Sequence, residues 1–138
     1  MIGPTAYFHR TYDETMALLI EARNYAAYHN EIDQRTMTAT DRLHACYEAL
    51  RVTSRLTQVM AWLLAQKAVH AGELTLEESA GDEYALSGGL VCSDPSGPEN
   101  QELPKGLRRL LDRSHKLYAR VLRLDDQVRR NCYQRAAM

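Results

Sequence analysis

Residues 51–73 read RVTSRLTQVMAWLLAQKAVHAGE, and this stretch decides the fold. Its apolar residues recur with the period of an α-helix, which Gly72 ends. They form two stripes that are centred roughly 100–130° apart at about 100° per residue. A helix that packs on one side needs only one stripe, so we expect this helix to lie between neighbours, one of which can belong to a second molecule. The pattern therefore favours an interaction protein over an enzyme. The first stripe contains Leu50, Thr53, Thr57, Met60, Ala61, Leu64 and Ala68, and the second contains Val52, Leu56, Val59 and Leu63.

The composition is that of an ordinary globular domain. The chain has 138 residues, 45% of them hydrophobic and 25% charged, with a net charge of -1, so no overall charge draws it to nucleic acid or to a membrane. The first residues lack the pattern of a signal peptide, and the longest apolar run, residues 59–65, is too short to cross a bilayer. Cys46, Cys92 and Cys132 fit neither a disulfide framework nor a zinc site, and we expect a cytoplasmic protein with reduced thiols.

Three long helices are predicted, at about residues 5–29, 38–71 and 104–131. The first starts near Thr5 or at Thr11, where TYDE has the form of a capping box; Thr38 offers a similar cap, and Pro104 is a favoured first-turn residue. Together they predict an all-α fold with a single domain over residues 1–138, an elongated antiparallel three-helix bundle. The connector between the second and third helices, residues 72–103, is long enough to let the third helix return in either direction, and Thr75 starts one short helix within it.

Charge is distributed unevenly along the chain. The connector has eight acidic residues and no Lys or Arg, whereas residues 104–138 have ten bases and three acids. One interpretation is a solvated face that the acidic connector partly neutralises. The alternatives are a surface for an acidic protein partner and, less favoured because no recognition motif accompanies it, a surface for nucleic acid. The basic stripe of the third helix comprises Arg109, Arg113, Lys116, Arg120 and Arg123.

Residue patterns that carry chemistry are missing from the sequence. None of the five histidines lies three or four residues from another His or a Cys, so no metal site is predicted. The adjacent carboxylates Asp125 and Asp126 diverge by about 100° on a helix. Gly88 and Gly89 follow no strand and make no phosphate-binding loop. We therefore expect neither catalytic residues nor a cofactor.

Three blocks of sequence resemble the RcdA family, small alphaproteobacterial proteins long catalogued as a domain of unknown function. The first block is TYDETMALL with EARNY at residues 11–25, the second is TSRLTQVMAWLLAQKAV with Gly72 and Glu73, and the third is LDRSHKLYARVLRLDD at residues 111–126. The blocks occur in order and cover residues 8–130, nearly the whole chain.

The resemblance implies a three-helix bundle that forms a homodimer and acts as a non-enzymatic adaptor. The family's named member helps the protease ClpXP degrade a cell-cycle response regulator, together with other adaptors, in the cytoplasm and at a cell pole. The resemblance also implies that this chain has partners of the same kinds: the protease ATPase, a response regulator or another adaptor. That member has a longer C-terminal tail than residues 132–138 of this sequence.

Two surfaces are candidates for these contacts. We expect partners to bind the basic stripe or the acidic connector. The alternative functions are a DNA-associated regulator that uses the third helix, a helical interaction protein of unrelated role, and a helical enzyme of unrecognised type. The dimer interface is predicted on the second helix at Leu56, Val59, Trp62, Leu63 and Gln66. The alternative is that these residues all belong to the core of a single chain.

Overall fold

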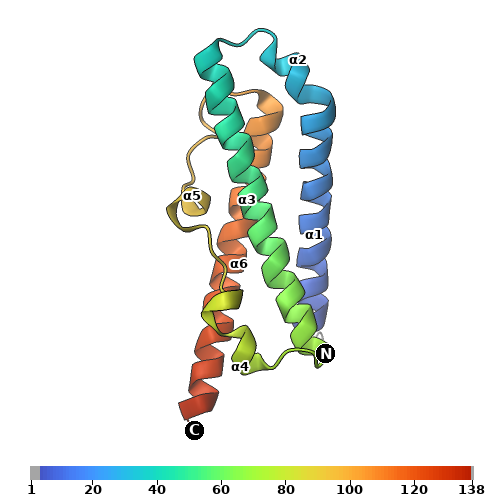
Figure 1. Ribbon diagram of the computed structural model, residues 1–138, viewed down its shortest axis with the longest axis vertical. Coiled ribbons are helices and arrows are strands. Elements are labelled where there is room, and N and C mark those ends of the chain that lie inside the picture. Colours follow the sequence, from blue (N-terminus) through green and yellow to red (C-terminus); the bar gives the residue numbers. More distant parts are fainter. Residues whose placement is uncertain (1–3, 138) are drawn as a thin grey trace.

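The computed structural model describes residues 4–137, and all regular secondary structure within them is helical. Three long helices lie side by side as an elongated bundle (Figure 1). The first continues from α1 through a π-helical turn, η1, into α2, and α4, η2 and α5 are short. The elements are α1 (Pro4–Asn24), η1 (Tyr25–His29), α2 (Asn30–Gln34), α3 (Ala39–His70), α4 (Leu76–Ser79), η2 (Asp82–Tyr84), α5 (Gly89–Ser93) and α6 (Lys105–Ala137).

The three long helices do not all alternate in direction. α6 is parallel to α3, because Arg55 contacts Leu111 and Trp62 contacts Asp125, so positions increase together. α1 is antiparallel to both (Figure 1). The predicted all-α three-helix bundle is confirmed, but its alternating antiparallel order holds only for α1. The physical reason is the connector, which runs back along the bundle before α6 begins.

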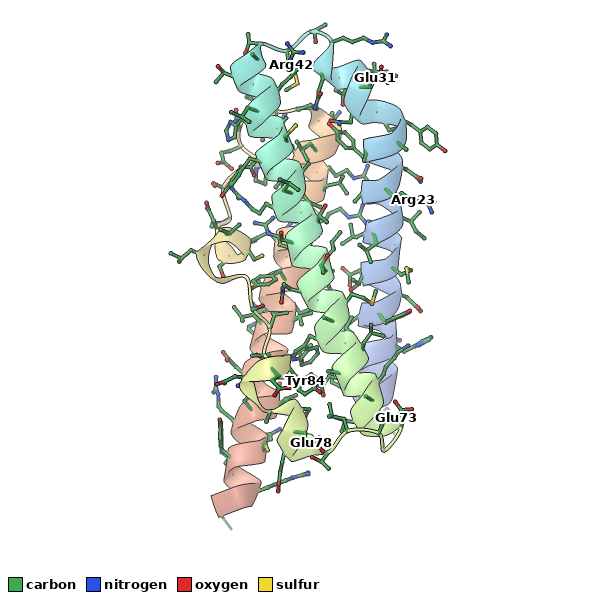
Figure 2. The ribbon with its side chains drawn as sticks, in the orientation of Figure 1. Arg23, Glu31, Arg42, Glu73, Glu78 and Tyr84 are labelled. Atoms are coloured by element: carbon green, nitrogen blue, oxygen red, sulfur yellow. The ribbon has the colours of Figure 1, made fainter. Side chains whose placement is uncertain are left out.

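The core lies where the three long helices meet. Leu56, Val59 and Leu63 of α3 are fully buried together with Leu111 and Val121 of α6. Fully burying one such side chain contributes about 1.5–3 kcal/mol. Side chains fill the space between the ribbons (Figure 2).

Some helices begin where the sequence predicts, and others extend beyond their predicted ends. The Thr38 hydroxyl accepts a hydrogen bond from the Asp41 amide (3.1 Å), and Thr75 forms a capping box with Glu78 at the start of α4. α1 begins before Thr11, so Thr11 lies inside the helix, where its carbonyl accepts from the Thr15 hydroxyl (2.7 Å). α6 continues beyond the predicted end at residue 131. This longer α6 projects past the end of α3 (Figure 1).

Substitution of Gly88 in the connector is expected to lower the stability of the protein. Its φ is 116°, and a Cβ atom there would lie 2.4 Å from the Cys92 sulfur. We expect Gly88→Ala to lower the free energy of unfolding by about 2–4 kcal/mol, because backbone strain and overlap add. Gly72→Ala is the matched control: its φ is 78°, but a Cβ meets nothing within 4 Å, so only about 1–2 kcal/mol of strain is expected. Urea unfolding measures both, and equal losses would contradict this account.

Candidate interaction surface

The acidic connector is attached to the bundle through its backbone carbonyls, chiefly by Arg55. This side chain is fully buried on α3. Its Nε donates to the Cys92 carbonyl (2.9 Å), and its Nη2 donates to the Asp94 carbonyl (2.6 Å). Its Nη1 donates to the Leu111 carbonyl (3.0 Å) and the Ser114 hydroxyl (3.2 Å) of α6. One guanidinium group therefore joins α3, α6 and the end of α5.

Arg51 supports the same attachment one turn earlier on α3. Its Nη1 donates to the Ser96 carbonyl (2.8 Å), and its Nη2 pairs with Glu48 (2.8 Å), which is also buried. Burial, and then the nearby Arg51 charge, lowers the pKa of Arg55. Burial also raises the pKa of the Cys92 thiol, which favours the neutral form. The arrangement is a buried structural cluster, in which Glu48 Oε2 and Arg51 Nε have no hydrogen-bond partner among the described residues.

A second attachment lies near the other end of α3. The Trp62 indole N–H donates to the Asp125 carboxylate (2.8 Å), and Arg129 bonds the same carboxylate from Nε (3.3 Å). Arg129 also donates from Nη2 to the Gly81 carbonyl (3.0 Å) beside η2. Asp125 is buried, so its charge is compensated by these donors. Asp125 therefore pairs with Arg129, and its carboxylate is not paired with that of Asp126.

Carboxylates of the connector accept hydrogen bonds from the connector's own backbone. Asp94 accepts from the Ser96 amide (2.9 Å), and Glu99 accepts from the Gly97 amide (3.1 Å). These backbone hydrogen bonds lower the pKa of both carboxyl groups. The hydrogen bonds stabilise the ionised forms and fix the turns that lead into α6.

A pH dependence follows from Asp94 and Glu99. Their pKa values are lowered in the folded chain from the ordinary 3.8 and 4.5. The unfolded chain therefore binds more protons in acid, so this stability is complete above about pH 5 and is lost as the pH falls through the lowered values. We expect the urea midpoint to fall from about pH 5 to pH 3, and less steeply in Asp94→Asn. Identical pH profiles for the two proteins would contradict this assignment.

The basic stripe of α6 is largely paired inside the chain. Arg113 pairs with Glu21 and Arg120 pairs with Glu14, both on α1, and Lys116 pairs with Asp112 (3.0 Å). Neutralisation of the stripe therefore comes from α1 rather than from the connector. These pairs are partly exposed and contribute at most about 1 kcal/mol each, so a partner's carboxylates can compete for them. Among the described residues, Arg109 and Arg123 have no charged partner.

Four of the five residues predicted for the dimer interface lie in the core instead. Leu56, Val59 and Leu63 are fully buried, and Trp62 is 2% exposed. Trp62 packs edge-on against Phe8 of α1, with ring centroids 5.5 Å apart. A second copy cannot reach these side chains without unpacking the bundle, which corrects their assignment. The fifth, Gln66, is 4% exposed and borders a hollow at the end of the bundle.

The opposite side of α3 is exposed and carries no formal charge. We call it the α3 outer face, and within it Leu43, Leu50 and Leu64 are 74%, 66% and 52% exposed. The acidic and basic residues of positions 43–66 are Glu48, Arg51 and Arg55, and all of them point into the protein. Helix faces in contact with water are normally polar or charged, so the exposed apolar residues make this face a candidate interaction surface. The α3 outer face comprises Leu43, Cys46, Tyr47, Leu50, Thr53, Ser54, Thr57, Ala61 and Leu64.

Within residues 4–137, no group of three or more potential metal-ligating side chains comes together. No helix of this region has both the length and the hydropathy needed to cross a bilayer.

Sequence reasoning missed the buried polar residues of α3. The buried stripe continues through polar positions, and apolar periodicity alone does not include the charged residues Glu48, Arg51 and Arg55. The signal was their 3–4 spacing with Val59 and Trp62. The stripe runs through Glu48, Arg51, Arg55, Val59, Trp62 and Gln66.

Comparison with known proteins identifies a family and a similar solved structure. Residues 4–137 match the sequence model of a family described as "Protein of unknown function (DUF1465)". Among solved structures, the chain is similar to the crystal structure of RcdA from Caulobacter crescentus CB15, with 34% sequence identity and a TM-score of 0.69. The similarity covers 88% of this chain and 89% of that chain. No curated protein matches.

Proposed function

Because this chain belongs to the RcdA family, the DUF1465 proteins, we propose that it is a non-enzymatic adaptor in regulated proteolysis. In this role it assists the ClpXP protease in degrading cell-cycle regulators. The mechanism is tethering: the adaptor holds cargo near the protease and so raises its local concentration, without chemistry of its own. The partners are the protease ATPase and a response regulator or another adaptor, in the cytoplasm and at a cell pole.

The observation that carries the proposal is the α3 outer face. Leu43, Leu50 and Leu64 present apolar surface to solvent, whereas the acidic and basic residues of positions 43–66 are buried. A large apolar surface free of charge is typical of protein–protein contacts.

We assign the α3 outer face to a second copy of the chain. Leu43, Tyr47, Leu50, Thr57 and Leu64 follow the 3–4 spacing of a coiled-coil seam. From Leu43 to Leu64 the seam extends about 32 Å at 1.5 Å per residue. The homodimer implied by the family resemblance then places two sets of partner surfaces on one particle, which strengthens binding to a multisubunit protease.

Affinity capture tests the adaptor role. A tagged copy is produced at its native level in its own cells and recovered, and the bound proteins are identified by mass spectrometry. We expect the protease ATPase, response regulators or further adaptors to be enriched over an untagged control. Recovery of none of these classes would count against the proposal.

A further inference from the structure

A groove opens at the end of the bundle where α3 finishes. It consists of three adjoining hollows of about 390, 390 and 400 Å³. Phe8 and His70 line the first two hollows, and Leu76 and Arg135 line the first and third. α1, α3, α4 and the C-terminal part of α6 all contribute to it, and α4 lies between the ends of α3 and α6 (Figure 1). Hollows of this size are typical of ligand sites.

The interior of the groove combines apolar surface with an unused amide. Val69, Leu76 and Val128 join Phe8 in the lining. Gln66 also lines the groove, is 4% exposed, and makes no side-chain hydrogen bond to any described residue. The amide atoms of Gln66 are not fully enclosed, so they are open to the groove and to the water in it. This amide is therefore placed to bond the backbone of a bound segment.

The rim of the groove is predominantly basic. Arg135 lies where the first and third hollows meet, and Lys67 borders the second. The Lys67 ammonium also lies 3.7 Å from the centroid of the Tyr12 ring. Among the described residues that line these hollows, Glu77 is the one with a carboxylate side chain. Carboxylates on a ligand would complement this rim.

We propose that the groove binds a peptide segment of a partner protein in which a large apolar side chain is flanked by carboxylates. The apolar side chain packs against Phe8 and Val128, the segment's backbone bonds Gln66, and a carboxylate pairs with Arg135. This deepens the adaptor role and rests on it, because it gives one partner a surface and a chemistry.

Peptide selection on the intact protein is the first test. Random peptides displayed on phage are selected on the immobilised full chain, and the enriched sequences are made as fluorescent peptides. We expect enrichment of Leu, Phe or Trp next to Asp or Glu, and binding by anisotropy that weakens as salt rises. Enrichment without acidic residues, or no enrichment over the starting library, would overturn the proposal.

Two variants test whether the peptide binds in the groove. Gln66→Met keeps the volume but removes the amide, and Arg135→Glu reverses a rim charge on an exposed residue. We expect each to weaken the selected peptide at least tenfold without lowering the melting temperature, whereas Arg42→Ala, at the far end of α3 (Figure 2), leaves binding unchanged. Unchanged affinity in both groove variants would refute the site.

Two outcomes separate this inference from its alternatives. If Arg135→Glu halves the particle mass in solution, the groove holds a second copy and the peptide proposal is overturned. If peptides bind the groove as expected but affinity capture recovers no proteolytic partner, the adaptor role fails and the groove stands as a peptide site.

Discussion

Arg55→Leu is expected to lower the free energy of unfolding by about 3–5 kcal/mol. The substitution removes one donor from each of the carbonyls of Cys92, Asp94 and Leu111 in a buried cluster, and the longer hydrogen bonds from Arg51 and Ser114 remain on the last two. Unsatisfied buried polar groups cost about 1–3 kcal/mol each, and removing one member of a buried charged network costs about 3–5 kcal/mol. Denaturant unfolding followed by circular dichroism measures the loss.

Two further variants make this test specific. Arg55→Lys keeps the positive charge but not the planar set of donors, so we expect an intermediate loss. Arg42→Ala removes an exposed arginine from the start of α3 (Figure 2) and should change the free energy of unfolding by less than about 0.5 kcal/mol. A loss below about 1 kcal/mol for Arg55→Leu would show that Arg55 does not hold the connector.

The second large effect concerns the proposed dimer. The double variant Leu50→Glu with Leu64→Glu should reduce the mass in solution from about 31 kDa to the chain mass of 15.7 kDa. Each copy would bring two carboxylates into an apolar seam, and the desolvation cost of buried charges exceeds what the seam contributes. Light scattering after size exclusion, at micromolar concentration, gives the mass directly.

A matched control separates the seam from apolar surface in general. Leu90 on α5 is 89% exposed but lies outside the α3 outer face, so Leu90→Glu should leave the dimer intact. Because Leu50 and Leu64 are already more than half exposed, the double variant should stay helical. A wild-type mass near 16 kDa, or a double variant that remains near 31 kDa, would contradict the assignment.

The sequence predicted that α3 has two apolar stripes but assigned the wrong stripe to the surface. Periodicity shows which residues share a helix face, and it does not show which face points inward. Val59 and Leu63 were expected at an interface and are buried, whereas Leu50 and Leu64 are exposed. The excess apolar surface is therefore real and lies on the opposite side of the helix.

The reversal has a cause in charged residues that apolar periodicity does not include. From its residue type alone Arg55 is expected at a surface, because an isolated buried charge is unfavourable. Its acceptors are main-chain carbonyls at positions 92, 94 and 111. The positions of these carbonyls relative to Arg55 depend on the path of the connector. The connector has no hydrophobic periodicity from which that path could be predicted. The same unknown path left the direction of α6 open in the sequence.

The most direct test of the adaptor claim is a reconstituted degradation assay with purified ClpXP, a response regulator and a concentration series of this chain. A tether that binds cargo and protease separately must first raise the degradation rate and then lower it, because excess adaptor occupies the two partners on different particles. We predict this rise and fall for the wild-type chain. A degradation rate that does not change across the whole series would contradict the proposed function.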